Sequence, residues 1–180
     1  MTPVKNLEML ISREQVAETV RRMARQVEGD YHGEMPLLVA VLKGSFIFLA
    51  DLVREIQRPV ELDFLRLSSY GGNTSTSGRV RLRMGVTSPV RERDVLVVED
   101  IVDTGLTTSY AARYLHRKGA ASVRLCTLLD KPARRRVPVA LDYIGFTVPN
   151  EFIVGYGLDF DEQYRHLPDI CILKGVGHEP

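Results

Sequence analysis

Short apolar runs recur along the chain, and segments of helical period stand between them. The runs at residues 37–42, 95–98 and 122–129 are typical of strands buried on both faces of a parallel sheet. Amphipathic helical patterns follow the first two runs directly, at 46–56 and 107–118. This alternation predicts an α/β fold in one domain, with a mostly parallel, twisted sheet flanked by helices.

The remaining segments predict smaller elements around that sheet. Ser12 and Gln15 form a capping-box pattern, and the helix that it opens should end at Gly29. Residues 60–69 read as a strand and 80–86 as a returning antiparallel strand, with a polar, glycine-rich loop between them. Three further short strands are expected, at 141–148, 152–156 and 170–173.

Composition narrows the possible function classes. Among 180 residues the formal net charge is +1, so no global field favours nucleic acid or a membrane surface. No apolar run approaches the roughly 20 residues of a membrane span, and no signal peptide is recognisable. Cys126 and Cys171 lie in apolar runs and are expected to be buried, reduced thiols, which fits the cytoplasm.

The stretch VLVVEDIVDTGLT, residues 95–107, carries the strongest chemical signal. Glu99 and Asp100 follow a buried strand, Asp103 comes three residues later, and small hydroxylated residues lead into a helix. Such a helix N-terminus suits a phosphate. The alternative is that Thr104 is the N-cap of the helix and has no role in ligand binding. Because neighbouring carboxylates repel one another, hydroxyl groups or a metal ion should lie among them. A phosphorylated sugar satisfies both requirements.

Other candidates lie at the ends of other predicted elements. The Lys43-Gly44-Ser45 loop joins a strand to a helix. From this spacing, a simple strand-to-helix turn and an anion-binding site are equally good interpretations of the loop. Lys131 follows the strand at 122–129, on the same edge as the acids. The arginines at 134–136 are expected to form a solvated turn or part of a subunit interface. Phe152 lies in an alternating apolar segment, and from that pattern by itself it would be interpreted as a core residue.

Five segments in order resemble a known family. EDIVDTGLT resembles the phosphoribosyl-pyrophosphate (PRPP) signature of type I phosphoribosyltransferases, and more narrowly of their hypoxanthine-guanine branch. The resemblance extends through LLVAVLKGS, SSYGG, LLDKP and NEFIVGYGLDFDEQYR. It implies the fold of that family. A hood would be formed by the N-terminal residues with about 140–173, and a flexible lid by about 69–79.

The resemblance also implies a reaction. The chain would transfer 5-phosphoribosyl from PRPP to hypoxanthine or guanine, giving IMP or GMP and pyrophosphate, with Asp103 as the general base at purine N7. Mg²⁺ would assist pyrophosphate departure. In that family the peptide bond at the position of Leu42–Lys43 is often cis, although the sequence does not fix its form here. The protein would be a homodimer or homotetramer.

The residues implied for each part of the site are as follows. The ribose hydroxyls would be held by Glu99 and Asp100, and the 5-phosphate by residues 103–107 (Asp103, Thr104, Gly105, Leu106 and Thr107). Pyrophosphate would be held by Lys43, Gly44 and Arg165, beneath lid residues Ser69 and Tyr70. The purine would be held by Lys131, Phe152, Ile153 and Asp159, and magnesium by Glu99, Asp100 and Asp159.

Three alternatives remain open from the sequence. A related transferase could prefer xanthine or a pyrimidine, because the residues do not fix the preference at purine position 2. A regulatory RNA-binding protein on the same fold would need an extended basic face, which the charge disfavours. A PRPP-sensing domain without catalysis would have no use for Asp103.

Overall fold

The computed structural model describes residues 6–69 and 80–175. A six-stranded sheet forms its centre, in the order β4-β3-β2-β5-β6-β7. Only β4 runs antiparallel to its neighbour, so the predicted mostly parallel sheet is confirmed. These strands are β2 (Leu37–Leu42), β3 (Glu61–Ser69), β4 (Val80–Met84), β5 (Asp94–Val102), β6 (Ser122–Asp130) and β7 (Tyr143–Thr147).

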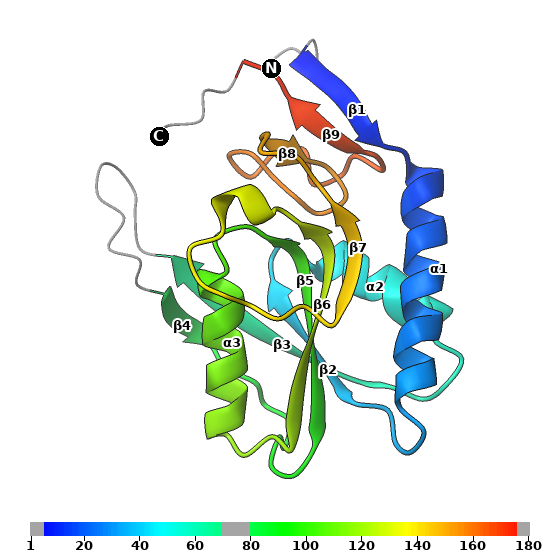
Figure 1. The fold of residues 1–180 in the computed structure, drawn as a ribbon, viewed down its shortest axis with the longest axis vertical. Helices are drawn as coiled ribbons and strands as arrows, with labels where there is room; N and C mark the ends of the chain where they lie inside the picture. The colour runs from blue at the N-terminus through cyan, green and yellow to red at the C-terminus, as the bar shows by residue number, and fades with distance from the viewer. Residues whose placement is uncertain (1–5, 70–79, 176–180) are drawn as a thin grey trace.

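Helices cover both faces of this sheet (Figure 1). On one face, α3 (Leu106–Arg117) packs against β3, β4, β5 and β6. On the other, α1 (Arg13–Asp30) and α2 (Phe46–Glu55) pack against each other and against the sheet. Successive side chains of β5 therefore enter different cores, because Val97 joins the α3 side and Val98 the α1–α2 side.

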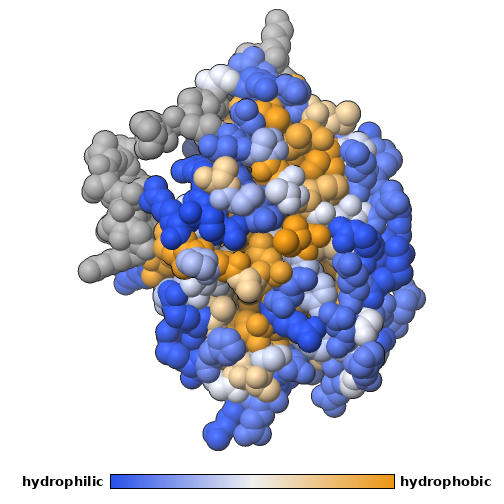
Figure 2. Space-filling model, viewed as in Figure 1, coloured by the Kyte–Doolittle hydropathy of each residue, from blue (hydrophilic) through white to orange (hydrophobic). Residues whose placement is uncertain are grey.

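The first helix begins as its capping box predicts. The Gln15 amide donates to Ser12 Oγ at 3.4 Å, and the Ser12 amide donates to Gln15 Oε1 at 2.9 Å. Its buried face includes Val16, Val20 and Met23, while hydrophilic side chains cover its outer side in Figure 2. The helix continues one residue beyond Gly29, to Asp30.

A second, smaller sheet forms the hood (Figure 1). It has the order β1-β9-β8, where β1 (Leu7–Ile11) and β8 (Ile153–Val154) each pair antiparallel with β9 (Ile170–Leu173). The expected hood boundary near residue 140 is wrong, because β7 pairs with β6 as the edge strand of the main sheet. Burial of Tyr143 in the main core holds β7 there. The hood therefore draws on residues after β7.

Cys126 and Cys171 are buried free thiols, as predicted. No described helix is both long and apolar enough to cross a membrane.

Candidate active site

A cavity of about 260 Å³ lies between the carboxyl ends of β5 and β6 and the hood. Six residues predicted from the sequence line it, and they come from the signature, the β6 end and the hood. They are Asp100, Asp103, Lys131, Phe152, Ile153 and Asp159. Three further lining residues were not predicted to do so, namely Ile101, Arg134 and Leu158. Residues far apart in sequence thus share one hollow at the edge where ligands bind in open parallel sheets.

Asp103 presents an unsatisfied oxygen. Its Oδ1 atom is buried without a hydrogen-bond partner among the described residues. Its Oδ2 atom lies 3.5 Å from a guanidinium nitrogen of Arg134. A buried carboxylate oxygen normally has a donor, so Oδ1 is available to accept a proton or hydrogen bond from a ligand.

Lys131 is almost fully buried beside Asp103. The residue is 4% exposed, and its Nζ atom donates to the Glu151 carbonyl at 2.7 Å. Burial lowers the pKa of Lys131, with Arg134 acting in the same direction and Asp103 opposing both. An ammonium has three N–H donors, so two remain for a ligand acceptor.

The two adjacent acids of β5 occupy different environments. Because side chains alternate along a strand, Glu99 and Asp100 leave β5 on opposite faces. Asp100 lines the cavity, whereas Glu99 is 5% exposed and lies outside its lining. The predicted role of Glu99 at the ribose and at magnesium therefore remains a prediction.

Burial shapes the protonation of both acids. It raises the pKa of Glu99 well above its ordinary value, and the neighbouring Asp100 adds to the effect. Burial likewise raises the pKa of Asp100 to about 6; backbone N–H groups and Arg165 oppose this rise, and Asp159 adds to it. Asp100 and Asp159 are therefore close enough to repel, an arrangement that a cation would relieve.

The loop that follows β5 is shaped to expose backbone N–H groups. Gly105, at φ 80°, is the N-cap residue of α3 and has no side chain with which to cap it. A Cβ on Gly105 would lie 2.7 Å from the Val137 carbonyl oxygen, so the position admits only glycine. Thr104 Oγ1 accepts from the Leu106 amide at 3.4 Å. Thr107 is half-buried in the first turn of α3.

The arginines at 134–136 correct the expectation of a solvated turn. Arg135 donates to the carbonyls of Val102 (3.1 Å) and Asp103 (3.0 Å), and it forms an ion pair with Asp130. Arg134 pairs with Asp103, as described above. Only Arg136 is exposed, and its backbone N–H donates to the Thr104 carbonyl at 2.9 Å. Local sequence could not reveal most of these contacts, because all the partners except Asp130 lie about 30 residues earlier.

The loop after β2 approaches the same cavity. The Leu42–Lys43 peptide bond is cis, a point that the sequence left open. Ser45 does not cap α2 with its side chain; its hydroxyl donates to the Val41 carbonyl at 2.6 Å. Gly44 lies directly against Asp100, since a Cβ there would be 1.7 Å from Asp100 Oδ2.

Arg165 lies near this loop and contacts residues between β8 and β9. It donates to the Gly157 carbonyl at 2.7 Å and lies 2.7 Å from Asp159 Oδ1. Its Nε atom is buried without a partner among the described residues. Lys43 Nζ and Arg165 both contact Glu162, which sequence reasoning did not single out.

The hood supplies the apolar side of the cavity. Phe152 is half-buried and packs edge-on against Phe160, with ring centroids 5.2 Å apart. Ile153, at the start of β8, is 6% exposed. The expectation that Phe152 is a plain core residue therefore gives way to a ring that borders the cavity.

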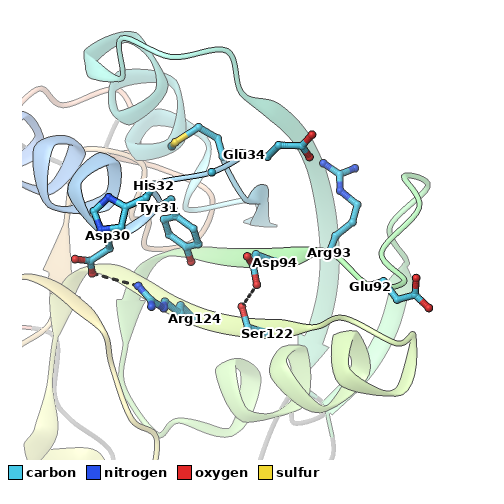
Figure 3. A pocket seen from close by; sticks show the side chains of 11 residues that line it. Asp30, Tyr31, His32, Glu34, Glu92, Arg93, Asp94, Ser122 and Arg124 are labelled. Carbon is cyan, nitrogen blue, oxygen red and sulfur yellow. Dashed lines mark hydrogen bonds and ion pairs between the residues drawn. The ribbon is translucent and has the colours of Figure 1, made fainter.

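A second hollow, of about 300 Å³, lies at the opposite edge of the sheet (Figure 3). Asp94 and Ser122, which begin β5 and β6, are part of its lining. Arg124 donates to Tyr143 Oη at 2.9 Å and to Asp30 at 3.2 Å, and its guanidinium lies 5.0 Å from the centre of the Tyr31 ring. None of the predicted site residues lines this hollow, so the candidate site is the cavity at the carboxyl edge.

The predicted lid falls almost wholly outside the described residues. Tyr70 and the loop to residue 79 are not described, and Ser69 is the last residue of β3. The lid therefore remains a prediction.

Comparison with known proteins agrees with this geometry. A family model described as "Phosphoribosyl transferase domain" matches residues 7–161. The match runs through the PRPP-like signature and through Lys131 to Asp159, the segments that line the cavity. The chain belongs to the phosphoribosyltransferase family.

Similar proteins identify the branch of this family to which the chain belongs. The hypoxanthine-guanine phosphoribosyltransferase of Streptococcus pneumoniae (strain R6) is 46% identical over 166 residues, which cover 92% of each chain. That of Bacillus subtilis (strain 168) is 42% identical over 171 residues, 95% of each. A crystal structure of a Staphylococcus aureus hypoxanthine phosphoribosyltransferase has a TM-score of 0.89 at 39% identity, covering 97% of this chain and 96% of that one. Within the family, the chain is a member of the hypoxanthine-guanine phosphoribosyltransferases.

Some relatives are much longer. The bifunctional protein TilS/HprT of Listeria innocua is 48% identical over 166 residues, which span 92% of this chain but 26% of that protein.

Proposed function

We propose that this protein makes purine nucleotides, transferring 5-phosphoribosyl from PRPP to hypoxanthine or guanine and releasing pyrophosphate. One observation carries the proposal. Asp103, with a buried oxygen lacking a partner among the described residues, and Lys131, with donors to spare, line the same cavity at adjacent strand ends. This pairing provides an acceptor for the purine N7 proton and a donor for the 6-oxo group.

The sugar would bind at the end of β5. Its 5-phosphate would accept hydrogen bonds from the backbone N–H groups of residues 103–107, at the positive end of the α3 dipole. Asp100, and Glu99 if it reaches the ribose, would accept from the 2′ and 3′ hydroxyls. As pyrophosphate leaves, C1′ becomes positively charged, and a carboxylate held nearby would stabilise that charge.

The purine would lie between the signature loop and the hood. Asp103 would remove the N7 proton, a transfer typically worth about 10²–10⁴ in rate. Lys131 would donate to O6, Phe152 would stack on the ring, and the backbones of Ile153 and Asp159 would contact the edge carrying the 2-substituent. An adenine amino group would oppose the ammonium donor to donor, which a buried site rejects strongly.

Pyrophosphate would be held by Lys43, the Gly44 amide and Arg165. The unsatisfied buried Nε of Arg165 supports this assignment, because a ligand oxygen could accept from it. Ser69 and Tyr70 would belong to a lid that excludes water from the sugar cation.

Magnesium would fit beside the leaving group. Asp100 and Asp159 both line the cavity and repel each other, and hard carboxylate oxygens are ligands that Mg²⁺ prefers. Since the described residues hold no group of three or more metal-ligating side chains, substrate oxygens would complete the coordination. When bound, the ion would neutralise charge on the departing pyrophosphate.

The regulatory RNA-binding alternative loses support from the arginine run. Arg134 and Arg135 are engaged with Asp103 and Asp130, so they do not form a free basic face. We further propose a cytoplasmic location and a homodimer or homotetramer.

The test is nucleotide formation with PRPP, magnesium chloride and each of five bases: hypoxanthine, guanine, xanthine, adenine and uracil. The proposal expects IMP and GMP with release of one pyrophosphate each, and little product from adenine or uracil. Preferred use of uracil or adenine would overturn it, and xanthine turnover above that of hypoxanthine would move it to the xanthine branch.

A further inference from the structure

A tight turn in the hood holds a glutamate in an unfavourable backbone conformation. Phe160 and Gln163 exchange backbone hydrogen bonds of 3.2 and 3.0 Å, and between them Asp161 and Glu162 have φ values of 51° and 59°. Positive φ at both central residues is the geometry of a type I′ hairpin turn, where asparagine, aspartate and glycine are usual. A glutamate at the second central position therefore calls for an explanation beyond turn formation.

The carboxylate of Glu162 reaches two cations on different segments. Lys43 Nζ donates to both of its oxygens at 2.9 Å, and a guanidinium nitrogen of Arg165 lies 3.4 Å from Oε2. The Glu162 amide also donates to Asp159 Oδ2 at 2.9 Å, which fixes the turn relative to the cavity. Among the described residues, Glu162 is the one ion-pair partner of Lys43.

These cations are the two that the proposed function assigns to pyrophosphate. An incoming pyrophosphate needs the same donors, and the Glu162 carboxylate carries the same sign of charge. The hydrogen bond from Lys43 lowers the pKa of Glu162, so the group is ionised at neutral pH. Ligand and glutamate therefore compete for Lys43 and Arg165.

We infer that Glu162 is an internal competitor for the pyrophosphate pocket, which pairs with Lys43 and Arg165 before PRPP binds and again as pyrophosphate leaves. This inference rests on the proposed function, and it adds a positioning residue that governs how tightly the leaving group is held. The side chain of Glu162 is 65% exposed, so it can turn into solvent without a large rearrangement. Release of pyrophosphate would then be helped by the return of this carboxylate.

The direction of the effect separates this role from a structural one. Loss of a structural contact would weaken ligand binding, whereas loss of a competitor strengthens it. Because exposed ion pairs are weak, we expect Glu162→Gln to tighten pyrophosphate binding by about three- to fivefold. The KM for PRPP of this variant should also be lower than that of the unaltered protein.

The test is calorimetric titration of the full chain with inorganic pyrophosphate in magnesium chloride, without base or PRPP. Asp161→Asn is the matched control, because Asp161 shares the turn and the positive φ but has no ion pair or side-chain hydrogen bond among the described residues. Each variant removes one negative charge from the same hairpin. The inference predicts tighter binding for Glu162→Gln and an unchanged Kd for Asp161→Asn.

Two outcomes would overturn the inference. One is unchanged or weaker pyrophosphate binding by Glu162→Gln, and the other is equal tightening by both variants, which would indicate a general charge effect. Failure of the unaltered protein to form nucleotide is a separate result and would overturn the proposed function instead, since the titration requires no turnover.

Discussion

Gly44 lies against Asp100 with no room for a side chain between them. A Cβ at Gly44 would fall 1.7 Å from Asp100 Oδ2, and a Cβ at Gly157 would fall 2.2 Å from the Gly44 carbonyl oxygen. The loop after β2, the end of β5 and the hood are thus packed into mutual contact. The position of the Asp100 carboxylate depends on a glycine 56 residues earlier in the sequence.

Gly44→Ala should therefore displace Asp100 and impair PRPP use. A misplacement of about 1 Å can cost roughly 10²-fold in rate, and we expect a loss of that order in kcat/KM for PRPP. Gly33→Ala is the control, because a Cβ at Gly33 meets nothing within 4 Å. Equal activity of the two variants would show that the close approach of Gly44 to Asp100 has no functional role.

Arg135 should hold the signature loop in place. Its removal by Arg135→Ala frees the carbonyls of Val102 and Asp103 and leaves Asp130 without its cation. We expect the free energy of unfolding to drop by about 1–3 kcal/mol and the KM for PRPP to rise. Urea denaturation measures the free energy of unfolding, and steady-state kinetics measure the KM. Arg136→Ala, which alters an exposed neighbouring residue, should change neither quantity. Similar losses for both variants would indicate that charge alone matters.

Stability should depend on pH through Asp100. Burial raises its pKa to about 6, so between about pH 4 and 6 the folded protein keeps a proton that the unfolded chain has released. Stability from this group is therefore lost as pH rises through that window. At pH 8 the free energy of unfolding of Asp100→Asn should be about 1–3 kcal/mol higher than that of the unaltered protein. This difference should shrink toward pH 4.

Urea denaturation of both proteins in metal-free buffer at several pH values measures this difference. Comparison with the variant cancels the titrating groups that Asp100 does not influence. Glu99 contributes to the difference in the same direction, because the Asp100 charge adds to the burial that raises the pKa of Glu99. An advantage for Asp100→Asn that did not change with pH would contradict the assigned protonation.

The sequence predicted the sheet, its helices and most of the site, because these depend on local patterns. Strand ends bring Asp100, Asp103 and Lys131 to one edge whatever the details of packing. The capping box at Ser12 was equally local and is confirmed. β1 was not predicted, because four of its five residues are at least partly exposed and its polar and apolar residues do not alternate. It forms only by pairing with the distant strand β9.

Contacts between segments could not be read from the sequence. Arg134, Arg135 and Glu162 each find partners that no local pattern specifies. Glu99 shows the converse limit: adjacent acids look like a single unit in the sequence, yet strand alternation sends them to opposite faces. The boundary of the hood was misjudged for the same reason, since only pairing with β6 assigns β7 to the main sheet.

Lys131 should control discrimination between purines. Lys131→Ala removes the proposed donor to O6 and the hydrogen bond to the Glu151 carbonyl. We expect the preference for hypoxanthine over adenine to fall by at least about tenfold, because a site built around a hydrogen bond rejects the mismatched base strongly. The ratio of kcat/KM values for the two bases measures this, and an unchanged ratio would assign purine recognition to other residues.

The most direct test of the central claim is the rate of IMP formation by Asp103→Asn beside that of the unaltered protein, with PRPP affinity measured on both. Asparagine keeps the shape of the side chain but cannot take the N7 proton. The account predicts a loss of about 10²–10⁴ in kcat with PRPP affinity retained. Near-normal turnover by the variant would contradict it.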